Sequence, residues 1–130
     1  MAAGPTETLG EYLRAFETLD PERFASFYNV PCIFITPAGA TAATDAAAVQ
    51  ALADKLVTGA RQYGFTRTEV VGAPECQMLS DTLAALSGVF RRFDSSDRLV
   101  LEMGSTYVMQ RADERWKIVA LMAYAPRASQ

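Results

Sequence analysis

The 130-residue sequence contains no histidine and only two cysteines. Histidine and clustered cysteine supply most zinc and other transition-metal ligands in proteins, so we expect no metal site and no other cofactor. Cys32 and Cys76 lie far apart, each inside a segment that predicts a strand. We therefore expect two free thiols, packed as small hydrophobic side chains, rather than a disulfide.

The sequence also lacks runs of basic residues and long apolar stretches. Twelve Lys and Arg against fifteen Asp and Glu give a net charge of −3, and Arg91-Arg92 is the one basic pair. Nucleic acid is therefore not an expected partner, because neutralising phosphates requires a basic face. The N-terminus has no signal-peptide pattern, and Asp54 and Lys55 interrupt the apolar run of 49–56. We expect a cytoplasmic protein that does not bind membranes.

The length predicts one domain covering residues 1–130, large enough to bury a core. Its first half shows helical spacing. One apolar stripe consists of Leu9, Tyr12, Leu13, Phe16 and Leu19. Thr6, which follows Pro5, is the predicted N-cap of this helix.

Two further helices are predicted. Asp20-Pro21 starts a short helix that carries Phe24, Phe27 and Tyr28 and ends near Asn29. Thr44 or Asp45 caps a longer one, which ends at Gly64. Its shared apolar face consists of Val49, Leu52, Leu56 and Ala60.

Strands dominate the rest of the chain. A buried strand is predicted over 31–36, between the two helical regions. Long strands then follow at 66–74, 82–93, 99–110 and 116–124, joined by short polar turns. Such long strands in a small domain must bend, and Gly72, Gly88 and Gly104 are the candidate bulge or bend positions.

Both faces of the last strands are apolar. We expect Trp116, Ile118, Ala120, Met122 and Tyr124 on one face, opposite Val119, Leu121 and Ala123. An antiparallel sheet with one wet face would alternate apolar and polar residues, whereas helices can cover only one side here. We therefore predict a homodimer through the second face. The alternative is a cover made by loops of the same chain.

The order of these elements resembles the nuclear transport factor 2-like (NTF2-like) superfamily, in its SnoaL-like and ketosteroid-isomerase-like branch. The segments that carry the resemblance are 12–16, 19–24, 27–28, 34–37 and 111–119. The resemblance implies an α+β fold in which a curved antiparallel sheet, mixed at one edge, wraps as a cone around three helices from the N-terminal half. A pocket is expected between the concave face and the helices.

Ketosteroid isomerases use a carboxylate base and an oxyanion hole made by a tyrosine and a protonated aspartic acid. By resemblance, Tyr12 matches the tyrosine, while Thr36 stands where the base is expected and no acid occurs over 106–109. Glu102 is the one acid within the predicted strands at 82–93, 99–110 and 116–124. It is a candidate base if it faces the pocket, and a surface group if it pairs with Arg91 or Arg92.

Three hypotheses follow. The first is a pocket protein that binds a small hydrophobic ligand and lacks the usual catalytic acids. Its predicted ligand-binding residues are Tyr12, Phe16, Tyr28, Phe34, Thr36, Val89, Met103 and Tyr107. The second is an isomerase, cyclase or dehydratase acting on a hydrophobic carbonyl compound, with Tyr12 stabilising an oxyanion and Glu102 as base. The third is a dimerisation module whose cavity is filled by side chains.

Overall fold

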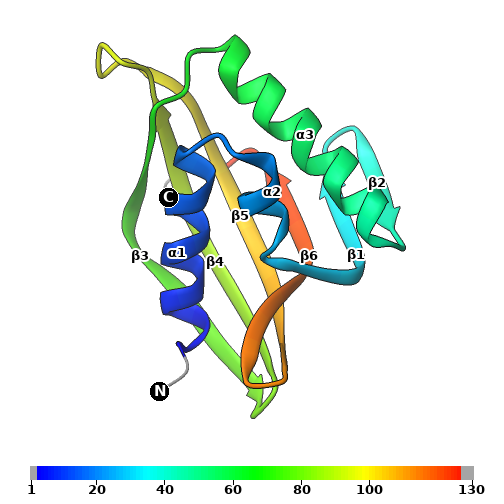
Figure 1. The fold of residues 1–130 in the computed structure, drawn as a ribbon. Helices are drawn as coiled ribbons and strands as arrows, with labels where there is room; N and C mark the ends of the chain where they lie inside the picture. The colour runs from blue at the N-terminus through cyan, green and yellow to red at the C-terminus, as the bar shows by residue number, and fades with distance from the viewer. Residues whose placement is uncertain (1–2, 127–130) are drawn as a thin grey trace.

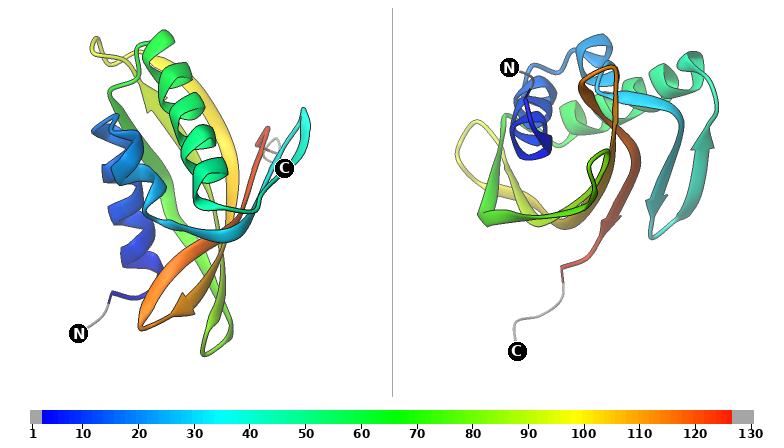
Figure 2. Two further views of the ribbon diagram at one scale, coloured as in Figure 1. Left: turned by 45° about the vertical axis from the view of Figure 1, so that its right-hand side comes forward. Right: turned by 90° about the horizontal axis from the view of Figure 1, so that it is seen from below.

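A computed structural model describes residues 3–126. Three helices and six strands follow one another along the chain: α1 (Pro5–Glu17), α2 (Pro21–Ala25), β1 (Tyr28–Thr36), β2 (Gly39–Ala43), α3 (Ala46–Gln62), β3 (Arg67–Ser80), β4 (Leu83–Phe93), β5 (Leu99–Ala112) and β6 (Arg115–Tyr124). The strands form one curved sheet in the order β2-β1-β6-β5-β4-β3, and the helices lie against its concave face (Figures 1 and 2). Only the β1–β6 pair is parallel within this sheet. The predicted α+β cone with a mixed sheet is confirmed.

The helix starts follow from capping residues. Asp20 Oδ1 accepts hydrogen bonds from the backbone N–H groups of Glu22 and Arg23, at 3.1 and 3.4 Å, and Pro21 takes the first helical position of α2. Asp45 caps α3 by accepting from Ala48 N–H at 2.8 Å. The prediction for α1 is wrong: Gly4 is the N-cap, because Pro5 already has a place in the first turn.

The second predicted helix is too long by several residues. α2 ends at Ala25, and Tyr28 begins β1. Tyr28 pairs in parallel with Ile118, whose N–H donates to the Phe27 carbonyl at 2.8 Å. Sheet pairing with a strand some ninety residues away along the chain thus outweighs the local helical spacing. β2 was not predicted, because its sequence, GATAA, carries no alternation of large apolar and polar residues.

The strand ladders contain five register shifts, of which one in β3 and one in β6 bear on the predicted bends and faces. Gly72 has a φ of +72° and lies in the register shift of β3 between Val71 and Glu75, as predicted. Gly104 lies in regular pairing, so the prediction of a bulge there is wrong. Gly88 pairs regularly with Ser105 of β5 but lies opposite the register shift of β3, between Ser87 and Val89. Another register shift is at Val119, where β6 carries one extra residue opposite β5.

The Val119 bulge changes which residues share a face of β6. A bulge reverses the alternation of side chains beyond it. Trp116 and Ile118 are buried against the concave side, but Leu121 and Ala123, not Met122, continue that row. The predicted single row from Trp116 to Tyr124 is therefore split between the two faces.

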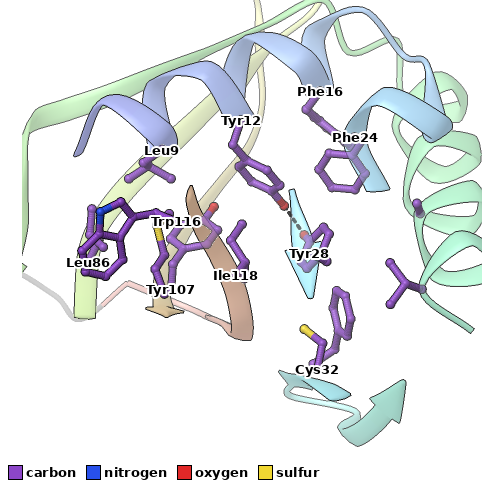
Figure 3. Close-up of a cluster of buried hydrophobic side chains, with 14 of the residues drawn as sticks. Leu9, Tyr12, Phe16, Phe24, Tyr28, Cys32, Leu86, Tyr107, Trp116 and Ile118 are labelled. Atoms are coloured by element: carbon purple, nitrogen blue, oxygen red, sulfur yellow. Dashed lines mark hydrogen bonds between the residues drawn. The ribbon is translucent and has the colours of Figure 1, made fainter. Parts of the chain in front are cut away.

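The core lies between the concave face and the helices, and aromatic side chains dominate it. The ring of Tyr12 on α1 is surrounded by other rings, with Phe24 at a centroid distance of 4.9 Å and Tyr107 at 5.5 Å. Figure 3 shows Tyr12 pointing from α1 toward Tyr28 of β1, with Leu9 and Trp116 further along the same layer. The apolar stripe predicted for the first helix therefore packs into the core, where Leu9, Tyr12 and Phe16 are buried.

The two cysteines differ. Both are free thiols, as predicted. Cys32 is buried among core residues of β1, but Cys76 on the edge strand β3 is exposed, so the prediction of a packed thiol is wrong for Cys76. The helices of residues 3–126 include none with the length and apolar character needed to cross a bilayer. No group of three potential metal-ligating His, Cys, Asp or Glu side chains occurs in that part of the chain either.

Candidate functional site

A cavity of about 400 Å³ lies between the concave face of the sheet and the helices α1 and α3. Six of the predicted ligand-binding residues line it: Tyr12, Phe16, Phe34, Thr36, Met103 and Tyr107. The further lining residues are mostly apolar and include Phe24, Leu56, Ala60, Leu101, Leu121 and Ala123. The volume and apolar lining are typical of sites for small molecules.

Two predicted residues lie elsewhere. Val89 is on the convex face of β4, because it alternates with the buried Phe90. Tyr28 is buried but lies behind the cavity wall, where its hydroxyl group hydrogen-bonds to that of Tyr12 (Figure 3). The prediction that Val89 and Tyr28 line the cavity is therefore wrong.

Glu102 points away from the cavity. Its neighbours in β5, Leu101 and Met103, line the cavity, so Glu102 faces the convex side. There it accepts from Arg91 Nε at 2.5 Å, in a cross-strand pair whose side chains are partly exposed. Glu102 is therefore a surface group paired with Arg91, which is the second of the two alternatives predicted for it. Its carboxylate cannot reach a molecule held on the other side of the sheet.

Thr36 lies at the mouth of the cavity, where the resemblance expects a carboxylate base. Its hydroxyl accepts the backbone N–H of Ala38 at 3.2 Å, which closes the turn between β1 and β2. Of the described residues that line the cavity, none is acidic. No carboxylate is therefore placed to take a proton from a molecule in this cavity.

The hydroxyl groups of Tyr12, Tyr28 and Tyr107 stay protonated near neutral pH. Burial raises the pKa of Tyr12 and of Tyr28 well above the ordinary value. Burial also raises the pKa of Tyr107 to about 12, although the Arg92 charge and the Ser105 hydroxyl partly oppose this shift. Neutral tyrosines can donate hydrogen bonds to a ligand but cannot act as bases near neutral pH.

Arg92 also lines the cavity, and the sequence analysis did not predict this. It lies on β4, and its guanidinium group reaches the cavity over the ring of Phe16, 4.5 Å from the ring centroid. Nη1 donates to the hydroxyl of Tyr63 at 2.6 Å. Two positions along β4 from the core residue Phe90, Arg92 shares its face of the strand, and this alternation is the signal that could have identified it.

A second polar group lies at the cavity wall. Ser105 is fully buried on β5, and its hydroxyl, next to that of Tyr107, makes no hydrogen bond of normal geometry. Buried hydroxyl groups are nearly always paired in proteins, so an unpaired one that faces a cavity is a candidate contact for a ligand or an ordered water.

A family model described as NTF2-like protein (DUF6841) matches residues 6–126. The chain belongs to this NTF2-like family. No curated protein sequence matches it. Among solved structures, a domain of unknown function with a cystatin-like fold from Nostoc punctiforme gives a TM-score of 0.74 at 19% identity, covering 95% of this chain and 75% of the other.

Two other structures illustrate how widely this NTF2-like fold is used. A protein provisionally named a calcium/calmodulin-dependent protein kinase type II association domain, from Thiobacillus denitrificans, gives a TM-score of 0.77 at 16% identity, with 98% of each chain covered. A protein provisionally named a ketosteroid isomerase, from Parabacteroides distasonis, gives 0.69 at 17%, covering 95% and 89%. Structural similarity at identities this low establishes the cone-shaped NTF2-like fold alone. The function has to be argued from the residues of the candidate site.

Proposed function

We propose that this NTF2-like protein binds a small, largely apolar molecule in the concave cavity and does not perform acid–base turnover on it. The observation that carries the proposal is the composition of the lining: apolar walls, a few hydroxyl groups and no carboxylate among the described residues. Burial of apolar ligand surface would supply the binding free energy, and the hydroxyls would orient the ligand.

The alternative hypotheses receive less support. An isomerase or cyclase that uses Tyr12 and Glu102 requires both groups on one side of the sheet, and they lie on opposite sides. A pure dimerisation module needs no cavity, whereas one of about 400 Å³ lies beside the core.

A neutral fluorescent probe tests binding. N-phenyl-1-naphthylamine is apolar and gains fluorescence when it enters a dry site, so we expect saturable enhancement with the wild-type protein. Met103→Trp places a larger side chain in the cavity wall and should reduce the enhancement several-fold. Met78→Trp is the matched control, because Met78 is 51% exposed on the edge strand β3 and does not line the cavity. Equal binding by both variants would reject the cavity as the site.

The partner proposal concerns the convex face. Ile33 and Ile35 are 38% and 37% exposed there and pair with Ala120 and Met122 of β6. Val108 lies next to Ala120 across the β5–β6 ladder, so an apolar band crosses three strands. Bands of this kind mark interaction surfaces, and a second copy of the chain is the proposed occupant.

Sedimentation tests this dimer. The chain mass is 14.1 kDa, and we expect a species of twice that mass at micromolar concentration. Ile35→Glu should shift the distribution to monomer, because a carboxylate would be buried without a partner. Ala51→Glu on the exposed face of α3 adds the same charge elsewhere and should leave the dimer intact. A wild-type monomer would refute the proposal.

A further inference from the structure

The cavity holds a cation for which the structure provides no counter-charge. The ion pairs found among residues 3–126 are Arg67–Glu69, Arg67–Asp97, Arg91–Glu102 and Arg98–Asp94, and none includes Arg92. Nη1 of Arg92 is used by Tyr63, a neutral group. Nε is buried and has no hydrogen-bond partner. Arg92 is half-buried, and a charge that is partly removed from water normally has a partner of opposite sign, because its desolvation is otherwise costly.

Aromatic packing explains how Arg92 is held but does not satisfy its N–H groups. The guanidinium carbon lies 4.5 Å from the centroid of Phe16 and 5.4 Å from that of Phe65. These contacts fix the plane of the group and stabilise its charge in part. Nη1 is bound to Tyr63 and Nε is covered by protein atoms, so Nη2 is the donor that remains for a ligand. A guanidinium donor at an apolar cavity favours an anionic acceptor such as a carboxylate.

The other residues that line the cavity are apolar or carry further hydrogen-bond donors. Lys55 adds a second positive charge at the lining, and the described lining residues include no acid to oppose it. This local positive charge contrasts with the net charge of −3 for the whole chain. General attraction of anions to the protein surface is therefore not expected, and anion binding at the cavity has to come from the cavity itself.

The geometry points to an amphipathic organic carboxylate as the ligand of this cavity, an inference that rests on the proposed function and narrows it. The carboxylate would accept a hydrogen bond from Arg92 Nη2, and the apolar body would lie against Met103, Leu121 and Phe34.

A pair of matched ligands tests the inference. We would measure binding of 1-naphthylacetate and of its neutral amide, 1-naphthylacetamide, by competition against N-phenyl-1-naphthylamine. The two compounds share one apolar body and differ in charge. The wild-type protein should bind the carboxylate at least about ten-fold more tightly, the ratio expected when a charge-assisted pair replaces a neutral contact.

Two arginine variants locate the effect. Arg92→Met keeps an unbranched apolar stem that can pack near Phe16 but removes the charge and the donors, so the preference should fall to less than about two-fold, with binding of the neutral probe retained. Arg91→Met removes the same charge from the neighbouring residue on the convex face and should leave the preference unchanged. Retained probe binding also shows that Arg92→Met has folded. If Arg92→Met does not fold, two other measurements take its place: the preference of Lys55→Met, and the dependence of the wild-type preference on salt concentration. Salt screening weakens an ionic contact and leaves an apolar contact unchanged.

Each outcome has a distinct meaning. Equal affinity of wild-type protein for acid and amide, with the neutral probe bound, overturns the carboxylate inference and leaves the proposed function standing. A carboxylate preference that Arg91→Met abolishes assigns the anion to the convex surface and also overturns it. Failure of the wild-type protein to bind the neutral probe and both naphthyl compounds refutes the proposed function, and the carboxylate inference with it.

Discussion

The ring of Tyr124 occupies the space that a side chain would need at position 104. A Cβ atom built on Gly104 would lie 2.7 Å from Cδ1 of Tyr124 and 3.1 Å from Cζ. In that position the Tyr124 hydroxyl hydrogen-bonds to Thr106 Oγ1 at 2.8 Å, and Thr106 in turn bonds to Ser87 Oγ at 2.8 Å. A row of hydroxyl groups thus connects β6, β5 and β4 on the convex face because residue 104 has no side chain.

Gly104→Ala should therefore destabilise the protein. The methyl group would displace the Tyr124 ring and break its hydrogen bond to Thr106, at a cost of about 1–3 kcal/mol in the free energy of unfolding. Urea unfolding followed through Trp116, the one tryptophan of the chain and a buried one, measures this change.

Gly59→Ala is the matched control for this substitution. A Cβ atom on Gly59 meets no atom within 4 Å, and the residue lies inside α3. Alanine should stabilise the helix there by about 0.5–1 kcal/mol. Two Gly→Ala changes with opposite signs are expected, and equal effects would contradict the role assigned to the Tyr124 ring.

Gly104 also illustrates where sequence reasoning about the sheet stops. The pattern identified the strands, their turns and the fold class, because turn residues and apolar alternation are local properties. It could not separate a glycine that bends a strand, as Gly72 does, from one that receives a neighbouring ring. It could not locate the bulge at Val119 either. Because of this single extra residue, the side chains of β6 beyond Val119 lie on the faces opposite to those predicted.

The hydroxyl groups of Tyr12 and Tyr28 form a buried pair that a double-mutant cycle can test. Tyr12→Phe or Tyr28→Phe alone leaves one buried hydroxyl without this partner, and we expect each to cost about 1–2 kcal/mol. The double variant removes both groups, so its cost should fall short of the sum by about 1 kcal/mol. Additive costs in urea unfolding would show that the two hydroxyls do not depend on each other.

The positions of Tyr12 and Phe16 at the cavity lining could be predicted from the first helix, whereas positions on the strands were predicted unevenly, for a physical reason. Tyr12 and Phe16 follow from a helical stripe, which is defined by several residues and tolerates an error of one position. Val89 and Glu102 each depend on the alternation of a single strand, and a shift of one residue reverses it. From the sequence, Arg92 was interpreted as a possible surface partner of Glu102. The sequence does not show whether the aliphatic part of an arginine side chain crosses the core or lies on the surface.

The stability of the protein should decrease at alkaline pH. Burial raises the pKa of the Cys32 thiol from 9.0 to about 11, so the folded state holds this proton more tightly than the unfolded state does. The stability is therefore complete below about pH 9 and is lost as pH rises toward 11, by about 2–3 kcal/mol. Tyr107, with a pKa of about 12, extends the loss to higher pH.

Unfolding free energies measured from pH 8 to 11 test this dependence. Cys32→Ala removes the titrating group, so its stability, although lower at pH 8 because of lost packing, should change less between pH 9 and 10. An identical slope in wild type and variant would show that Cys32 stays protonated in both states, or is open to solvent in the folded one.

The two thiols should also react at very different rates with 5,5′-dithiobis(2-nitrobenzoate). Cys76 is exposed on the edge strand β3 and should react within seconds, whereas Cys32 is 2% exposed and is reached only when the structure opens. One equivalent of thiol is therefore expected in a fast phase at pH 8, and a second in a slow phase that denaturant accelerates. Cys76→Ser should remove the fast phase alone. Two equivalents of thiol in the fast phase would place Cys32 at the surface and would contradict its burial in β1. They would also contradict the alkaline loss of stability assigned to Cys32, because the same buried environment accounts for the low reactivity and for the raised pKa.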